Sequence, residues 1–256
     1  MIVLKIGGNV LNNPATLHEA LDYFASLVEP AVLVHGGGRR ASQVLEAMGR
    51  QPVMHLGRRV TDRASLEVVT MVYAGLLNKD IVAQLQARGS NAIGLSGADG
   101  NAVLAVKRPP TPVDYGFAGD VTAVNAPLLD ALLRLGMQPV LCPITHDRHG
   151  QLLNTNADTI ATETTVALAR HGHRVALQYC FELPGVLREV QDPDSVIPEL
   201  TPTTYAELKQ AGGVAGGMLP KLDNAFRAVA AGASEVRIGD LRGLRDGGGT
   251  RCVVAS

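Results

Sequence analysis

The sequence predicts an α/β sandwich. Short apolar runs of strand length alternate along the chain with amphipathic runs of helix length, which is typical of a sheet covered by helices. The chain has 256 residues, of which 46% are hydrophobic, so it can bury a large core without covalent staples. Its three cysteines, Cys142, Cys180 and Cys252, form no CxxC pair, so the sequence predicts neither a disulfide framework nor a zinc site.

The first half of the chain supplies most of the predicted elements. Residues 16–28 predict a helix because Leu17, Ala20, Leu21 and Phe24 recur at helical spacing. Comparable patterns predict strands at 2–4, 31–34, 92–95, 102–106 and 139–142, and further helices at 39–48, 128–135 and 158–170. The Pro- and Gly-rich residues 107–121 indicate an excursion or a hairpin.

A long helix is predicted over residues 62–88. Thr61 or Asp62 can cap its start, and Gly89 can end it. Its apolar residues cover more than one narrow stripe, so the helix is either deeply buried or part of a subunit interface. We favour the interface, which predicts an isologous homodimer.

The second half repeats the alternation. It predicts a strand at 174–179, a turn at 182–185, helices at 202–211 and 221–231, a strand at 235–238 and a closing strand at 251–254. We place a soft lobe boundary at 171–173.

Composition argues against several classes of partner. The formal net charge is −1, whereas nucleic-acid binding needs a basic patch. No apolar run approaches the roughly 18 residues of a membrane-spanning helix. Met1 is followed at once by an apolar strand, not by a cationic leader segment. We therefore expect a cytoplasmic protein with a small-molecule substrate and with no nucleic-acid or membrane partner.

Two glycine clusters follow the first two predicted strands. Lys5 is followed by Gly7 and Gly8, and the second strand runs into residues 35–38, His-Gly-Gly-Gly. Glycines at such turns expose backbone N–H groups to an anion, and a lysine adds positive charge. The alternative is an ordinary strand turn. Neither cluster has the GxGxxG spacing or the Gly-Lys-Ser/Thr of a Walker A loop.

Three polar clusters lie further along the chain. Residues 57–62 carry two adjacent arginines before a helix cap, and an arginine fork suits a carboxylate. Residues 154–158, Asn-Thr-Asn-Ala-Asp, form a polar run before a helix. Residues 216–221 place Lys221 at a predicted helix start, which is unfavourable beside the helix dipole unless an anion is near. Each cluster also has a simpler explanation. The arginines of 57–62 would be solvated surface charge, residues 154–158 would be a capping turn, and Lys221 would be an exposed lysine.

The order of these clusters resembles the amino-acid kinase family over essentially the whole chain. The resemblance runs through Lys-Ile-Gly-Gly at 5–8, His-Gly-Gly-Gly at 35–38, Gly-x-Arg-Val-Thr-Asp at 57–62, Asn-x-Asn-Ala-Asp at 154–158, Gly-Gly-Met-x-x-Lys at 216–221 and Gly-Thr-Arg at 249–251. The arginine and Asn-x-Asn-Ala-Asp motifs are similar to those of kinases that act on N-acylated glutamate.

This resemblance implies a fold and a reaction. The fold is a three-layer αβα sandwich with a mostly parallel central sheet and two lobes. Residues 1–172 are expected to bind acyl-glutamate and to dimerise, and residues 173–256 to bind ATP. The implied enzyme moves the γ-phosphoryl group of ATP onto the side-chain carboxylate of N-acetyl-L-glutamate, in arginine biosynthesis. Relatives inhibited by arginine carry a helix before the first strand, so a homodimer without arginine feedback is expected.

The resemblance also assigns roles to individual residues. The implied catalytic residues are Lys5, Lys221 and Asp158. The implied acyl-glutamate contacts are Gly37, Gly38, Arg59, Asn154 and Asn156. The implied ATP contacts are Lys5, Gly7, Gly8, Glu182, Gly185, Met218 and Lys221. Mg²⁺ is expected to accompany ATP and to be held mainly by phosphates, so no protein metal ligand is predicted.

Two departures from the family pattern leave alternatives open. Glu182 and Phe181 stand where relatives carry aspartate and a hydroxyl residue, near the expected adenine and ribose contacts. Arg58 replaces a leucine and is suited to an acyl arm that ends in a carboxylate, as in N-succinyl-L-glutamate; alternatively it faces solvent, opposite Arg59. Another amino-acid kinase, such as a carbamate, uridylate or glutamate kinase, and a catalytically silent amino-acid sensor are the further alternatives.

Overall fold

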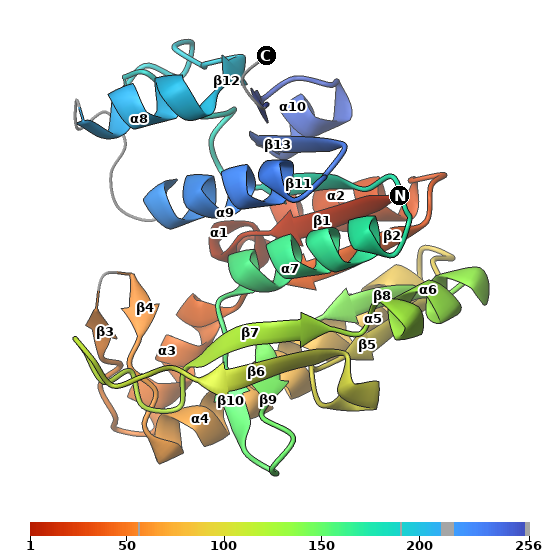
Figure 1. The fold of residues 1–256 in the computed structure, drawn as a ribbon. Helices are drawn as coiled ribbons and strands as arrows, with labels where there is room; N and C mark the ends of the chain where they lie inside the picture. The colour runs from red at the N-terminus through yellow and green to blue at the C-terminus, as the bar shows by residue number, and fades with distance from the viewer. Residues whose placement is uncertain (56, 190, 211–217, 254–256) are drawn as a thin grey trace.

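The computed structural model describes residues 1–55, 57–189, 191–210 and 218–253 and is built around one eight-stranded sheet (Figure 1). Across the sheet the order is β12 (Glu199–Leu200), β14 (Thr250–Cys252), β13 (Glu235–Gly239), β11 (Ala176–Cys180), β1 (Ile2–Ile6), β2 (Ala31–His35), β8 (Gln138–Leu141) and β5 (Ala92–Leu95). Only the β13–β14 pair is antiparallel, so the predicted mostly parallel sheet is confirmed.

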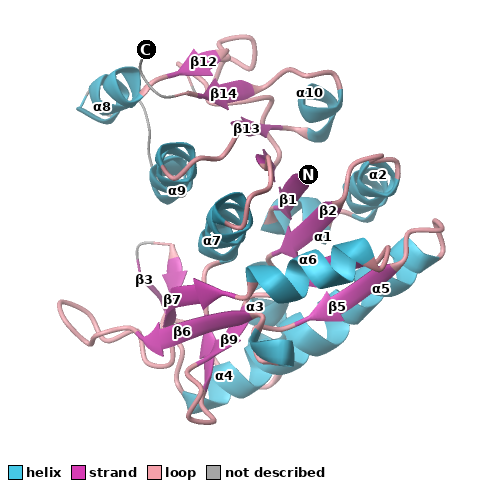
Figure 2. Ribbon diagram, turned by 45° about the vertical axis from the view of Figure 1, so that its right-hand side comes forward, coloured by secondary structure: helices cyan, strands magenta, loops and turns pink. Residues whose placement is uncertain are grey.

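Helices cover both faces of this sheet (Figure 2). One face carries α6 (Ala126–Arg134), α7 (Ala157–Arg170) and α9 (Met218–Ala230), and the other carries α2 (Pro14–Ala25), α5 (Asn78–Gln86) and α10 (Leu241–Arg245). Short α1 (Gly8–Asn12) precedes α2, α3 (Gly38–Ala47) follows β2, η2 (Asp99–Asn101) follows β5, and α8 (Pro202–Gln210) precedes α9. The predicted three-layer sandwich is confirmed.

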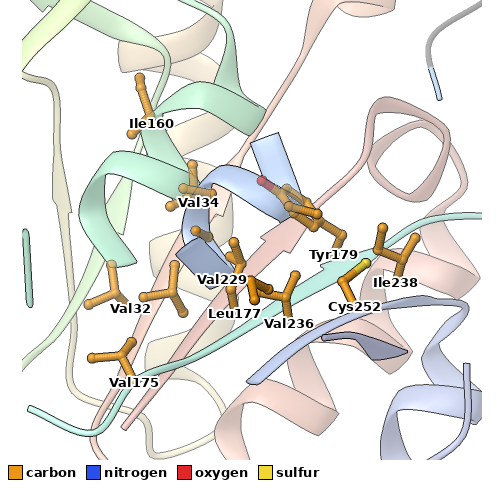
Figure 3. Close-up of a cluster of buried hydrophobic side chains, with 14 of the residues drawn as sticks. Val32, Val34, Ile160, Val175, Leu177, Tyr179, Val229, Val236, Ile238 and Cys252 are labelled. Atoms are coloured by element: carbon orange, nitrogen blue, oxygen red, sulfur yellow. The ribbon is translucent and has the colours of Figure 1, made fainter. Parts of the chain in front are cut away.

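Side chains of β1 alternate between two separate hydrophobic cores. Val3 packs into the core beneath α7 and α9, part of which Figure 3 shows, whereas Leu4 and Ile6 pack into the core on the α2 side. This two-residue period places Lys5 on the same face as Val3. The strand therefore delivers a lysine to the face covered by α7 and α9.

A second sheet, which the sequence analysis missed, lies beside the first. Its order is β10 (Leu152–Asn154), β9 (Ile144–His146), β6 (Val103–Lys107) and β7 (Gly119–Val124), and a separate pair joins β3 (Met54–His55) to β4 (Arg58–Arg59). Strands β6 and β7 are antiparallel, so the hairpin reading of residues 107–121 is confirmed. Beneath this sheet, α3 and α4 (Arg63–Thr70) enclose a third core.

The predicted helix 62–88 is one helical rod made of three segments. Asp62 caps α4 by accepting a hydrogen bond from the Ser65 N–H, and α5 ends at Gln86. Between them η1 (Met71–Leu77) is a π-helix, which the sequence analysis did not foresee. Of its apolar side chains, Met71 and Leu76 remain at least half exposed.

Two other predicted elements differ from the structure. Helix α9 begins by Met218, not at Lys221, so Lys221 is the fourth described residue of the helix. Gly216 and Gly217 of the predicted lysine motif lie outside the described residues, as does Val254 of the closing strand. None of the helices within the described ranges combines the length and apolar character that crossing a bilayer requires.

Candidate active site

The parallel register of β1 and β2 brings the two glycine clusters together. Lys5 lies opposite Val34, and Ile6 lies opposite His35, so both strands end at the same edge of the sheet. Beyond that edge lies a cavity of about 220 Å³. Its lining includes most of the predicted residues of the first lobe, namely Lys5, Gly8, Gly37, Gly38, Arg59, Asn154, Asn156 and Asp158.

Two lysines from distant parts of the chain share one carboxylate. Lys5 Nζ lies 2.7 Å from Asp158 Oδ1, and Lys221 Nζ lies 3.4 Å from the same oxygen. All three side chains are at most 13% exposed. Asp158 sits in the first turn of α7, where the helix dipole favours a negative charge. The predicted catalytic residues are therefore brought together, one from each of β1, α7 and α9.

The electrostatics of this cluster are set by competition between burial and charge. Burial alone would raise the pKa of Asp158, but the two ammonium groups outweigh it and lower that pKa to about 2. Burial and the neighbouring Lys5 lower the pKa of Lys221, although Asp158 counteracts them. The carboxylate is therefore ionised at neutral pH, and, with two ammonium groups beside it, it is too weak a base to be suited to proton transfer.

Lys221 is also held against aromatic rings. Its ammonium lies 5.1 Å from the centre of the Tyr179 ring and 5.6 Å from that of Phe181. Such cation–π contacts favour the charged amine in a buried setting. The anion that a lysine near a helix start requires is Asp158. Lys221 is not among the residues that line the cavity, but it pairs with Asp158, which does line it.

One predicted glycine donor is already engaged within the protein, and its contact with ATP stays a prediction. The Gly7 N–H donates to the Cys180 carbonyl at 3.0 Å, so it is not free to hold a phosphate oxygen. Gly8 borders the cavity and opens α1. Gly37 has φ +150, and a Cβ there would lie 2.5 Å from Leu77 Cδ1. A side chain at that position would be strained and would also clash.

Arg59 is buried with unused hydrogen-bonding capacity. It is 7% exposed, and its Nη2 donates to the Gly38 carbonyl at 2.8 Å and to Ser42 Oγ at 2.7 Å. Its Nε and Nη1 have no partner within the described part of the chain. A buried guanidinium with free donors beside a cavity is suited to a carboxylate ligand. Ser42, which helps to orient the Arg59 guanidinium, was not predicted from the sequence.

The two predicted asparagines differ in how much of the side chain remains free. Asn154 ends β10, and its Nδ2 donates to Thr61 Oγ1 at 2.9 Å. Its Oδ1 makes no hydrogen bond to the described residues and remains an acceptor beside the cavity. Asn156 Oδ1 caps α7 by accepting from the N–H groups of Asp158 and Thr159. The capping alternative is thus correct for Asn156, and only its Nδ2 remains free for a ligand.

Three arginines also line the cavity. Arg58 and Arg59 both border it, so the alternative of a solvent-facing Arg58 is not borne out. Arg108, which the sequence analysis missed, also borders it and stacks on the Tyr115 ring at 5.3 Å. Arg108 pairs with Asp120, whereas Arg58 has no carboxylate within 4.0 Å among the described residues. Burial, and then the charge of Arg108, lower the pKa of Arg58.

The remaining predicted ATP contacts lie away from this cavity. Glu182 is exposed and accepts a hydrogen bond from Asn9 Nδ2 at 2.8 Å. Gly185 is buried, and a Cβ there would lie 2.7 Å from Val196 Cγ1, so internal packing explains this glycine better than a ligand does. Met218 begins the described part of α9 and is partly buried against the core. Their contacts with ATP remain predictions.

The fold and the cavity define an α/β protein in which cationic side chains line a cavity where parallel strands end. The chain belongs to the amino acid kinase family, whose model matches residues 1–240. Acetylglutamate kinase of Phocaeicola vulgatus is 51% identical over 250 residues, which cover 98% of this chain and 97% of that protein. Acetylglutamate kinase of Bacteroides thetaiotaomicron is 51% identical over 251 residues, with the same coverage. A solved Streptococcus mutans structure, 28% identical, superposes with a TM-score of 0.83 over 98% of each chain.

Proposed function

We propose that this chain is a kinase that transfers the γ-phosphoryl group of ATP to the side-chain carboxylate of N-acetyl-L-glutamate, as a step of arginine biosynthesis. The observation that carries the proposal is the pair of lysines on Asp158 at a cavity that three arginines also line. The relatives that are about half identical over nearly the whole chain carry the name of this activity.

The reaction needs no general base. A carboxylate oxygen of the acceptor forms the new bond to phosphorus, the bond from phosphorus to the oxygen bridging to ADP breaks, and an acyl phosphate and ADP result. The acceptor carboxyl is already ionised at neutral pH. Catalysis therefore depends on bringing anions together and neutralising charge on the transferring group. Lys5 and Lys221 are suited to that role because both are buried and held at a fixed carboxylate.

Asp158 organises the lysines in this proposal. Each ammonium would lose hydration in the buried cluster, and the shared carboxylate offsets that cost. Because it is locked between two cations and has a pKa of about 2, it takes no proton during the reaction. The two lysines consequently keep one geometry whether or not substrate is bound.

The acceptor end is assigned to Arg59 and Asn154. The free Nε and Nη1 of Arg59 would bind the α-carboxylate of the amino acid. The free Oδ1 of Asn154 would accept a hydrogen bond from the acylamino N–H. Gly37, Gly38 and the Nδ2 of Asn156 would line the same pocket, which leaves the side-chain carboxylate directed toward Lys5.

ATP is assigned to residues 173–256, with Glu182 and Met218 near the nucleotide and Gly8 at its phosphates. The donor set suits phosphate-held Mg²⁺, because Asp158 is the single carboxylate among the described cavity-lining residues and is occupied by lysines. When bound, Mg²⁺ would neutralise phosphate charge. Among the described residues no group of three His, Cys, Asp or Glu side chains could form a metal cage.

We also propose a cytoplasmic homodimer. The supporting observations are the three buried free cysteines and the exposed Met71 and Leu76 on the helical rod. Apolar side chains exposed together on one helix favour contact with a second copy. Light scattering that gives the mass of one chain would contradict the dimer.

A specific observation favours a second candidate substrate. Arg58 is half-buried at the cavity, has no carboxylate partner among the described residues, and lies beside Arg108. The charge of Asp120 offsets part of the cost of holding this guanidinium near another cation, and a ligand anion would offset more of it. An acyl arm that ends in a carboxylate, as in N-succinyl-L-glutamate, would supply that anion.

One assay tests both candidates. Purified protein is incubated with ATP, Mg²⁺ and a panel of acceptors, and the acyl phosphate is trapped with hydroxylamine. The panel contains N-acetyl-L-glutamate, N-succinyl-L-glutamate, L-glutamate, carbamate and UMP, with phosphorylated products of the last two measured directly. Product from an N-acyl-glutamate alone supports the proposal, whereas product from none of the panel, or from carbamate or UMP, contradicts it.

A further inference from the structure

His35 is a buried titratable residue that the mechanism above does not use. It is the last residue of β2 and is 0% exposed. Its Nδ1 lies 2.8 Å from the Gly36 carbonyl oxygen, and its Nε2 lies 3.2 Å from Asn78 Nδ2. Both ring nitrogens therefore have a partner, one on the glycine turn and one on the helical rod.

These partners assign the tautomer of the ring. A carbonyl oxygen only accepts, so Nδ1 carries the proton. Asn78 Nδ2 also donates to the Val140 carbonyl at 2.9 Å, which orients the amide and makes Nε2 the acceptor. Burial lowers the pKa of His35 to about 4, although the hydrogen bond to the Gly36 carbonyl opposes the shift. The ring is thus neutral, with a fixed Nδ1–H.

The ring fixes the peptide that joins Gly36 to Gly37. A trans peptide is planar, so a Gly36 carbonyl directed at His35 sends the Gly37 N–H the opposite way. The Gly37 carbonyl accepts from the Ala41 N–H at 3.1 Å, and Arg59 donates to the Gly38 carbonyl at 2.8 Å. Within the described ranges the N–H groups of Gly37 and Gly38 have no acceptor, and both glycines border the cavity.

The helical rod fixes the same turn from the side. Asn78 is the first residue of α5, directly after the π-helix η1. From η1, Tyr73 and Leu77 pack so close to Gly37 that a Cβ there would lie 2.9 Å from one and 2.5 Å from the other. One element therefore supplies both the hydrogen bond behind His35 and the packing against the turn.

We propose that His35 and Asn78 are positioning residues that aim the Gly37 N–H at the reacting anions. The inference rests on the proposed function for the identity of those anions. An N–H whose orientation is fixed in advance stabilises the charge that develops in the transition state. An N–H of variable orientation stabilises it less. His35 exchanges no proton with the substrate; it acts through the backbone of the glycine turn.

Kinetics of two substitutions at one position test the proposal. His35→Leu removes the donor while keeping an apolar side chain of similar size, and should lower kcat by roughly 10–100-fold with little change in the KM for ATP. His35→Asn places an amide donor near the position of Nδ1 and should recover much of that loss. His18→Leu, at an exposed position of α2, is the matched control. Unchanged kcat in His35→Leu, or no recovery in a folded His35→Asn, would overturn the proposal.

A spectroscopic measurement tests it without relying on any variant's activity. With ¹⁵N-histidine label in the wild-type chain, one of the seven rings should be Nδ1-protonated and should not titrate between about pH 6 and 8. Loss of that signal in His35→Asn assigns it, and Asn78→Leu should convert it to mixed tautomers. A ring protonated at Nε2, or an ordinary titration, would overturn the inference. Absence of acyl phosphate in wild type would instead contradict the proposed function and leave this measurement valid.

Discussion

Two groups of cations at the cavity differ in how their charge is compensated: Lys5 and Lys221, called the lysine end, and Arg58 and Arg59, called the arginine end. At the lysine end, Lys5 and Lys221 are compensated by Asp158 before any substrate arrives. At the arginine end, Arg59 keeps free donors, and Arg58 has no carboxylate within 4.0 Å among the described residues, although the charge of Asp120 acts on it. A cation that the protein's own carboxylate neutralises is held in place, which suits stabilisation of the transition state. A cation that the protein leaves without such a carboxylate is suited to binding an anionic ligand. Substitutions at the two ends should therefore affect different kinetic constants.

Removing the internal anion should have the largest effect. Asp158→Asn leaves two buried ammonium groups without their shared partner and should destabilise the fold by about 3–5 kcal/mol. It should lower kcat without adding an acidic limb to the pH profile. Because the folded pKa of Asp158 is about 2, below its ordinary value of 3.8, the wild-type contribution is present above that ordinary value and is lost as pH falls toward 2.

Urea unfolding at pH 7 and near pH 3 measures this contribution. The wild type should lose stability over that interval by more than the variant does, since the variant has no carboxylate at this position. Equal losses in both proteins would mean that Asp158 is not the stabilising anion.

The lysines themselves come next. Lys5→Met and Lys221→Met should each lower kcat by roughly 10²-fold or more, because each removes a cation that acts mainly in the transition state. Steady-state kinetics by hydroxylamine trapping gives the values, and Arg134→Met on exposed α6 is the control. A kcat close to wild type in either variant would break the distinction between the two ends.

At the arginine end the expected effect shifts to binding. Arg59→Lys keeps the buried charge but loses the fork, so the KM for the acyl-glutamate should rise by roughly ten- to hundredfold. The KM for ATP should change little. If instead kcat falls and the KM for the acyl-glutamate is unchanged, Arg59 belongs functionally with the lysines.

The smallest effect concerns the choice of acyl group. Arg58→Leu should reduce the ratio of kcat/KM for N-succinyl- over N-acetyl-L-glutamate by roughly tenfold, the value of one charge-assisted bond. An unchanged ratio in the variant removes Arg58 from acyl recognition. A wild-type preference for the acetyl substrate removes the second candidate altogether.

Many of the strands and turns that form the site are predictable because short stretches of the sequence determine them. The two strands that carry Lys5 and His35, and the turns that follow them, are visible as apolar runs ending in glycine. By contrast, the Lys5–Asp158–Lys221 cluster joins three distant segments, so only the family resemblance pointed to it. The sequence around Asp158 indicates only a helix start. Its role depends on the two lysines that the fold brings to it.

Other features left no usable local signal. Strands β9 and β10 have three residues each, too short for an alternating pattern to register. Arg108 sits in a Pro- and Gly-rich stretch, and only β6–β7 pairing brings it to the cavity. Glycine at position 7 fits a phosphate-binding turn, but the sequence does not show that the Gly7 N–H donates to the Cys180 carbonyl of the neighbouring strand.

The π-helix η1 also affects how the chain tolerates the deletion of a single residue. Its wider i→i+5 turns hold a residue that an α-helix of the same rise would not. Deleting one residue between 71 and 77 would convert the segment to an α-helix of nearly the same rise, so α4 and α5 would keep about the same orientation relative to each other. Asn78 would stay near His35, but the side chains within the segment, Tyr73 and Leu77 among them, would no longer point at Gly37 in the same way. A single in-frame codon loss there is therefore predicted to leave the rod folded and to disturb mainly the packing against the glycine turn.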